Sequence, residues 1–205
     1  MKASTKLEMK EFLAKSMTFA EYIKLIDDLL LEGKTTGGIQ SEAMFDYGRL
    51  NRQRMHRLEK TVSLGVELSE IVRSVQRPTI WLTLTEGWCG DAAQNIPVIE
   101  KIASESNNIE TRYLLRDENL ELMDVYLTNN ARSIPKLIVL DTQTFEVLGI
   151  WGARPAAAQD AYLNWKDQRL EKPAIMEKMQ RWYNDDKTLS LQSEFAELVK
   201  TWERR

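Results

Sequence analysis

The chain has 205 residues, of which 43% are hydrophobic and 29% are charged, with a net charge of −3 and a single cysteine. This composition is typical of a globular protein with one substantial core or two small ones, and it argues against a disordered chain. The small negative charge gives no reason to expect a nucleic acid or an anionic membrane as a partner, and one cysteine excludes an internal disulfide.

The first residues, MKASTKLEMKEFLAKSM, carry charges throughout. They contain no apolar run long enough for a signal peptide or a membrane span. We therefore expect a cytoplasmic protein, and the absence of disulfides agrees with a reducing compartment.

Residues 1–77 are predicted to form a helical extension that packs on the rest of the chain. Thr18 can cap a first helix whose apolar residues recur at helical spacing, and the glycine-containing segment 32–38 ends it. A basic helix is predicted over 41–62, and a shorter one over 67–76. The only histidine lies in the basic helix without metal-ligand partners, so we interpret it as a surface residue.

The pattern changes at Pro78 to alternating strands and helices. The predicted order is a strand over 78–86, a helix that starts at the cysteine, a strand over 108–115, a helix over 118–130, and an antiparallel hairpin of strands over 134–141 and 144–152. Pro155 is expected to open a closing helix through Trp165. Residues 167–205 are predicted to form further packing helices, interrupted at Pro173 and at the segment 183–188.

Four motifs between residues 78 and 166 resemble those of the thioredoxin fold. WCGDA (88–92) stands where thioredoxins carry Trp-Cys-Gly-Pro-Cys, and Pro97 stands where the following helix has its kinking proline. SIPKLIVLD (133–141) resembles the isoleucine and cis-proline before the family's hairpin, and WGA (151–153) resembles the glycine and alanine before the last helix.

The whole chain resembles bacterial thioredoxin-like proteins of uncharacterised function that carry a Cys-Gly-Asp-Ala motif. This resemblance implies an α/β thioredoxin-like fold, in which a central mixed sheet is flanked by helices, with additional N-terminal and C-terminal helices. The corresponding units are a helical extension (1–77), the thioredoxin-like unit (78–166) and C-terminal helices (167–205).

Two departures from the thioredoxin pattern limit the chemistry. Ala92 occupies the position of the second, resolving cysteine, and Thr83 occupies that of the buried aspartate that accepts the resolving thiol's proton. Without a second thiol, the chain cannot close a disulfide on itself after attacking a substrate. A dithiol reductase is therefore excluded, unless an external thiol supplies the second sulfur.

The resemblance implies that Cys89 is the reactive group. It implies substrate contacts from Trp88, Gly90, Asp91, Ile134, Pro135 and Gly152, with the Ile134–Pro135 bond cis. A helix N-terminus lowers the pKa of a thiol, whereas the nearby Asp91 carboxylate opposes that effect. The sequence leaves two interpretations open: Cys89 is an accessible, usable thiol, or it is a buried and inert remnant of the motif.

Three functions are compatible with these residues. The first is a monothiol oxidoreductase, whose Cys89 forms a mixed disulfide with a protein or small thiol that an external thiol resolves. The second is a non-catalytic module that binds a peptide or protein, and the third is a glutathione-transferase-like enzyme. We expect no cofactor and no metal site, with an external low-molecular-weight thiol as co-substrate in the first case.

Overall fold

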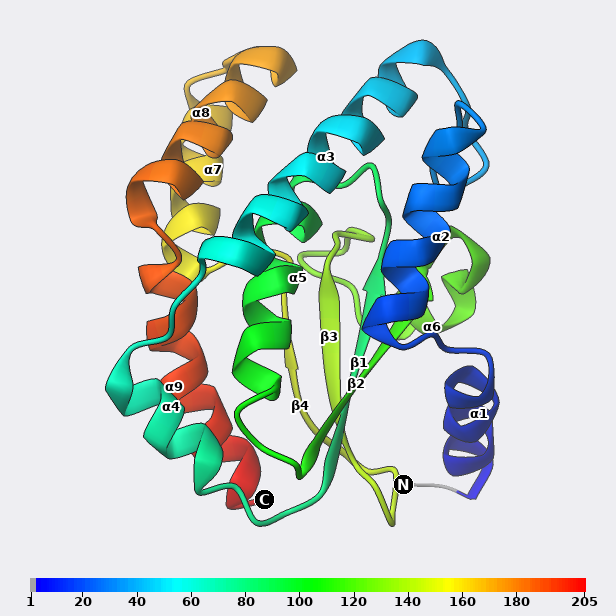
Figure 1. Ribbon diagram of the computed structural model, residues 1–205, viewed down its shortest axis with the longest axis vertical. Helices are drawn as coiled ribbons and strands as arrows, with labels where there is room; N and C mark the ends of the chain where they lie inside the picture. Colours follow the sequence, from blue (N-terminus) through cyan, green and yellow to red (C-terminus); the bar gives the residue numbers. More distant parts are fainter. Residues whose placement is uncertain (1–2) are drawn as a thin grey trace.

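The computed structural model describes residues 3–205 and consists of a four-stranded sheet surrounded by helices (Figure 1). Within the described residues, four helices precede the sheet: α1 (Ala3–Ala14), α2 (Phe19–Leu31), α3 (Glu42–Thr61) and α4 (Val66–Arg73). The central part contains β1 (Thr79–Thr85), α5 (Gly90–Ala103), β2 (Ile109–Leu115), a 3-10 turn (Arg116–Glu118), α6 (Leu120–Val125), β3 (Lys136–Asp141) and β4 (Val147–Trp151). Three helices follow: α7 (Ala156–Asp167), α8 (Lys172–Asp186) and α9 (Leu189–Glu203).

The strands lie in the order β2-β1-β3-β4. β1 is parallel to β2 and antiparallel to β3, and β3 and β4 form the predicted antiparallel hairpin. The parallel pair needs a crossover, which α5 supplies. The expected thioredoxin-like α/β fold, a mixed sheet flanked by helices with additional helices at both ends, is confirmed.

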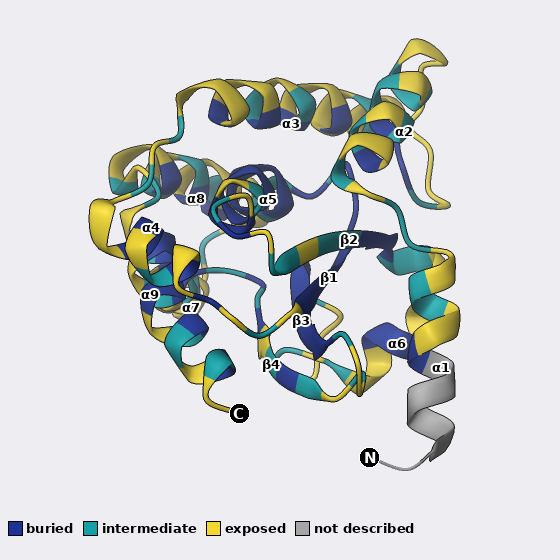
Figure 2. Cartoon of the chain, turned by 60° about the horizontal axis from the view of Figure 1, so that its bottom comes forward, coloured by how far each residue is buried: buried dark blue, intermediate teal, exposed yellow. Residues whose placement is uncertain are grey.

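β1 is buried along its whole length because helices cover both faces of the sheet. Its alternate side chains point to opposite faces, so Leu82 and Leu84 join one apolar cluster while Trp81 joins another. The first cluster includes side chains of α2 and α6, and the second includes side chains of α4 and α9. α5 contributes to both, and α3 lies outside α5 as a further layer (Figure 2).

The helix that covers the sheet after β4 is α9, whereas we expected the helix that follows Pro155 to do so. Phe195 and Trp202 of α9 pack edge-to-face against each other, and both contact Trp81 of β1. The side chains of α7 and α8 form a separate small cluster around Ala158, Met179 and Tyr183. Residues 156–186 therefore form a helical hairpin inserted between β4 and the helix that covers the sheet.

Several boundaries differ from the prediction. α6 ends at Val125, well short of residue 130, because the chain turns away at Tyr126. Pro173 lies in the first turn of α8, where its missing N–H has no helical partner to lose, so it opens a helix and does not interrupt one. The C-terminal break falls within the predicted segment 183–188, at Lys187 and Thr188, which both adopt left-handed backbone conformations.

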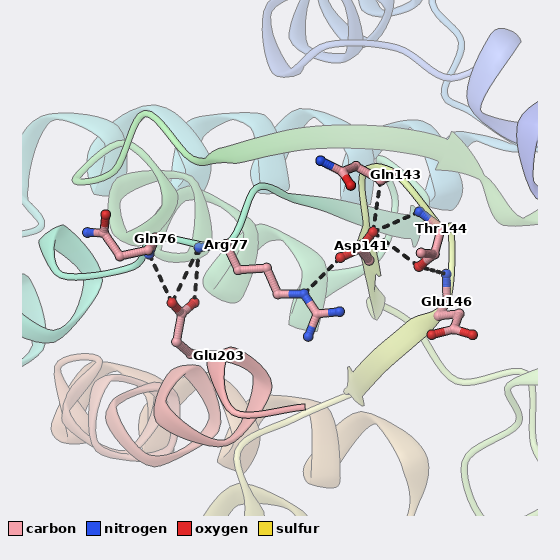
Figure 3. Close-up of polar contacts among 7 residues, drawn as sticks. All are labelled: Gln76, Arg77, Asp141, Gln143, Thr144, Glu146 and Glu203. Carbon is pink, nitrogen blue, oxygen red and sulfur yellow. Dashed lines mark hydrogen bonds and ion pairs between the residues drawn. The ribbon is translucent and has the colours of Figure 1, made fainter.

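Polar contacts join the start of β1 to the end of α9 and to the β3–β4 turn (Figure 3). Asp141 accepts hydrogen bonds from the backbone N–H groups of Gln143 and Thr144, and its other oxygen pairs with Arg77 at 2.8 Å. Burial alone would raise the pKa of Asp141, but these hydrogen bonds outweigh burial and lower it to about 2. Glu203 accepts from the backbone of Gln76 and Arg77, which anchors α9 beside the sheet.

None of the helices in the described part of the chain combines the length and the apolar character that a membrane crossing requires.

Candidate functional site

Cys89 lies at the N-terminus of α5, as the motif predicts. It is the N-cap residue, and its sulfur accepts a hydrogen bond from the backbone N–H of Ala92 at 3.5 Å. The Sγ–H donates to the backbone carbonyl of Ile134 at 3.3 Å. The Ile134–Pro135 peptide bond is cis, and this hydrogen bond places the sulfur beside the segment that leads into β3.

The thiol is buried in this arrangement, with 8% of the residue's surface exposed. Burial, followed by the negative charge of Asp91, raises the pKa of Cys89 to about 12. The N–H of Ala92 and the positive charge of Arg154 act in the opposite direction but are outweighed. Of the two opposing effects that the sequence indicates, the helix N-terminus does not prevail, because it does not offset the loss of water around the sulfur.

Asp91 is the centre of a buried polar network. One carboxylate oxygen pairs with the Arg154 guanidinium at 2.6 Å, and the other accepts the Tyr183 hydroxyl at 2.9 Å. Asn95 donates to the Tyr183 oxygen at 3.0 Å and to the backbone carbonyl of Asp91. Burial raises the pKa of Asp91, and the Arg154 charge opposes that rise. We call Asp91, Asn95, Arg154 and Tyr183 the Asp91 network.

The first turn of α5 is also covered by side chains of α3 and α8. A Cβ atom on Gly90 would lie 3.2 Å from Nε2 of Gln180 and 3.9 Å from an Nη atom of Arg54. Asn51 accepts a hydrogen bond from that Arg54 guanidinium and donates to the carbonyl of Gly87. These contacts leave little free space beside the motif.

Trp88 lies on the other side of the motif and is only partly buried. The Arg116 guanidinium sits over its ring, 4.9 Å from the centroid, in a cation–π contact. Arg116 is held there by two hydrogen bonds, which its Nε and one Nη atom donate to the same carboxylate oxygen of Asp117. Trp88 thus belongs to a polar surface network as well as to the motif.

Gly152 lies against the cis-proline. Its φ is +123°, and a Cβ atom there would come 2.1 Å from the carbonyl oxygen of Pro135, so only glycine fits. Together with Cys89, Ile134 and Pro135 it forms one compact group. The carbonyl of Ile134, expected to face a peptide, is occupied by the Cys89 thiol.

Sequence reasoning missed Arg154 and Tyr183. Arg154 directly follows the WGA motif, and the available signal was that the resemblance places this motif close to WCGDA, whose Asp91 has the opposite charge. Tyr183 gave no local signal, since its hydrogen bond with Asp91 spans 92 residues of sequence.

Among the residues that the structure describes, cavities of about 340 and 660 Å³ lie away from the motif, and neither of them is lined by Cys89 or Pro135. The smaller lies among α3, α5, α8 and the start of α9, and Asn95 and Tyr183 of the Asp91 network line it. The larger lies between α2 and the segment that follows β2. Within residues 3–205, no group of three or more potential ligands that could hold a metal is present.

Comparison with protein families matches residues 37–172 to the family described as thioredoxin. Comparison with curated proteins gives no match. A crystal structure of a protein of unknown function from Pseudomonas aeruginosa is similar with a TM-score of 0.57 and 17% identity, over 93% of this chain and 96% of that one. An HIV epitope scaffold is similar with a TM-score of 0.57 and 18% identity, over 96% and 98% of the two chains. At these identities the likeness concerns the fold alone, and it extends over the flanking helices.

Proposed function

The chain belongs to the thioredoxin family, and we propose that it acts as a monothiol member that forms a mixed disulfide through Cys89. The partner is a small disulfide or a protein disulfide, and an external thiol completes the cycle. A reducing compartment such as the cytoplasm would supply that thiol.

The proposed reaction has two steps. The Cys89 thiol loses its proton and attacks a disulfide R–S–S–R, forming Cys89–S–S–R and releasing R–S⁻, which takes up a proton. An external thiol R′–SH then attacks the mixed disulfide as its thiolate, forming R–S–S–R′ and restoring the Cys89 thiol. This cycle consumes one external thiol and leaves R–S–S–R′. A second R′–SH then reduces that disulfide by the same exchange, releasing R–SH and R′–S–S–R′, so two external thiols are oxidised for each disulfide that is fully reduced and the protein undergoes no net change.

The observation that carries this proposal is the position of the sulfur. It lies at the first turn of α5 and against the cis Ile134–Pro135 segment, and it accepts the N–H of Ala92. A mixed disulfide would keep the N–H contact and would replace only the thiol's bond to the Ile134 carbonyl. That carbonyl would then be free to accept a hydrogen bond from the bound partner.

A non-catalytic binding module is the second candidate, and the burial of Cys89 favours it. A thiol with a pKa of about 12 is almost entirely protonated at neutral pH, and only the thiolate attacks disulfides. If the closed arrangement is the only one that the protein adopts, the motif is a scaffold and the surface around it serves for binding alone.

Intact-mass measurement of the native protein after incubation with bis(2-hydroxyethyl) disulfide separates the two candidates. The monothiol proposal predicts one adduct, absent from Cys89→Ser, which a small thiol then removes. No adduct under native conditions, with full labelling after unfolding, would favour the binding module. Turnover of a protein disulfide by thioredoxin reductase alone, without added thiol, would contradict the monothiol mechanism.

A further inference from the structure

We propose that the α7–α8 hairpin is a movable cap that regulates access to Cys89, and that the hydrogen bond from Tyr183 to Asp91 holds it closed. This inference rests on the proposed function, because it names the structural element that controls the reaction of the same thiol.

The hairpin is separate from the two main apolar clusters. Its buried side chains, Ala158, Met179 and Tyr183, pack with Tyr162, Trp165 and Trp182 of the same two helices. α9, which follows it, belongs to the cluster that covers the sheet. The hairpin can therefore move as a unit without exposing the apolar core of the sheet.

Hydrogen bonds join α8 to the body of the protein. Tyr183 bonds to Asp91 and Asn95, Gln180 accepts a hydrogen bond from Gln94 at 2.8 Å, and Asn184 lies 3.4 Å from the Arg57 guanidinium. Water can replace most of such hydrogen bonds at a modest net cost, whereas separation of an apolar interface exposes hydrophobic surface. Moving α8 away from α5 therefore costs less free energy than separating α9 from the sheet.

The packing beneath the hairpin is incomplete. The cavity of about 340 Å³ separates α8 from α3 and α5 over part of their length, and Gln94, Tyr183 and Asn184 line it. The hinge on the C-terminal side is formed by Lys187 and Thr188, with φ values of +50° and +70°. These residues break the helix between α8 and α9, so α8 can rotate while α9 stays in place.

The hairpin acts on the thiol through the first turn of α5. Arg154, at the base of the hairpin, pairs with Asp91 and lies over the ring of Tyr162 in α7 at 4.3 Å. Gln180 of α8 sits against Gly90, the residue after the cysteine. Movement of α8 away from α5 removes the Tyr183 and Gln180 contacts together and uncovers the turn that carries Cys89.

Tyr183→Phe tests the cap, because it removes the hydroxyl and keeps the ring in its cluster. We expect the rate of Cys89 alkylation by iodoacetamide under native conditions to rise about tenfold. The substitution removes a hydrogen bond to a charged group that exists only in the closed state, so the open state becomes more populated. Tyr162→Phe is the matched control. It lies on the same hairpin, retains the ring over Arg154, and should leave the rate unchanged.

Hydrogen exchange of the wild-type protein provides a test without substitution. Backbone amides of α8 should exchange through an opening of lower free energy than those of α9. An unchanged alkylation rate in Tyr183→Phe, or equal exchange of α8 and α9, would overturn the cap.

The outcomes also separate the cap from the proposed function. Faster alkylation in Tyr183→Phe without any adduct from a small disulfide would support the cap and contradict the monothiol reaction. Adduct formation in the wild type at a rate that Tyr183→Phe does not change would support the reaction and contradict the cap.

Discussion

The reactivity of Cys89 depends on its immediate neighbours. The Ala92 N–H and the Arg154 charge favour the thiolate, while burial and the Asp91 charge disfavour it more strongly. The Asp91 carboxylate is itself paired with Arg154 at 2.6 Å, so its effect on the sulfur is partly compensated. Uncovering the first turn of α5 would remove the largest of the opposing effects, which is burial.

The first prediction at this scale concerns pH. Because the pKa of Cys89 is raised to about 12, the thiolate fraction at neutral pH is small and increases with pH. The rate of iodoacetamide alkylation should rise about tenfold for each pH unit between pH 6 and 8, without a plateau. A plateau within this interval would show an activated thiol and contradict the buried one.

The second prediction concerns Ala92, which is fully buried in the first turn of α5. Ala92→Cys places a second thiol next to a disulfide formed by Cys89, so the adduct should be released faster than in the wild type. The gain should be partial, since Thr83 offers no carboxylate to accept the new thiol's proton. Adduct decay followed by mass spectrometry measures this, and an unchanged lifetime would contradict it.

At the scale of the elements, β4 and α9 pack so closely that no side-chain atom can be added at residue 149. A Cβ atom on Gly149 would lie 1.8 Å from Nε1 of Trp202, whose ring is fixed edge-to-face against Trp81 and Phe195. α9 can approach the sheet this closely only because residue 149 has no side chain.

Gly149→Ala should therefore lower the free energy of unfolding by about 2 kcal/mol, the usual cost of overpacking a core. Gly38→Ala is the matched control, because a Cβ at that exposed glycine meets nothing within 4 Å. Chemical denaturation measures both variants. Equal stability of the two would mean that α9 does not pack on β4 as described.

At the scale of the whole molecule, the exposed segments differ in how firmly they are held. The glycine-containing segment 32–38 connects α2 to α3, but Thr35 and Thr36 within it are buried, and Thr36 accepts a hydrogen bond from the N–H of Gly87. The turn between α7 and α8 is exposed and contains Arg169 in a left-handed conformation, with φ of +57°.

We therefore expect limited trypsin digestion to cut first after Arg169 and not after Lys34. The two fragments should remain associated, because α9 is held by the sheet. Mass spectrometry of the earliest products identifies the site. A first product that ends at Lys34, or early release of a fragment beginning near Pro78, would contradict this picture.

The sequence by itself determined the order and type of the strands, the position of the cysteine at a helix start and the stoichiometry of its chemistry. These properties are local: strand periodicity, caps and turns act over a few residues, and the number of thiols is a matter of composition. The apolar run of β1, the alternation in the sequence of β2 and the Thr18 cap were readable for this reason.

Only the tertiary structure decided whether the thiol is open to solvent. Cys89 is buried because segments that are far apart in the chain pack around it. The partners of Asp91 likewise come from distant segments: Arg154 follows β4, and Tyr183 belongs to α8. The same is true of the helix that covers the sheet: α7 and α9 both have apolar faces, and three-dimensional packing against Trp81 assigns that place to α9.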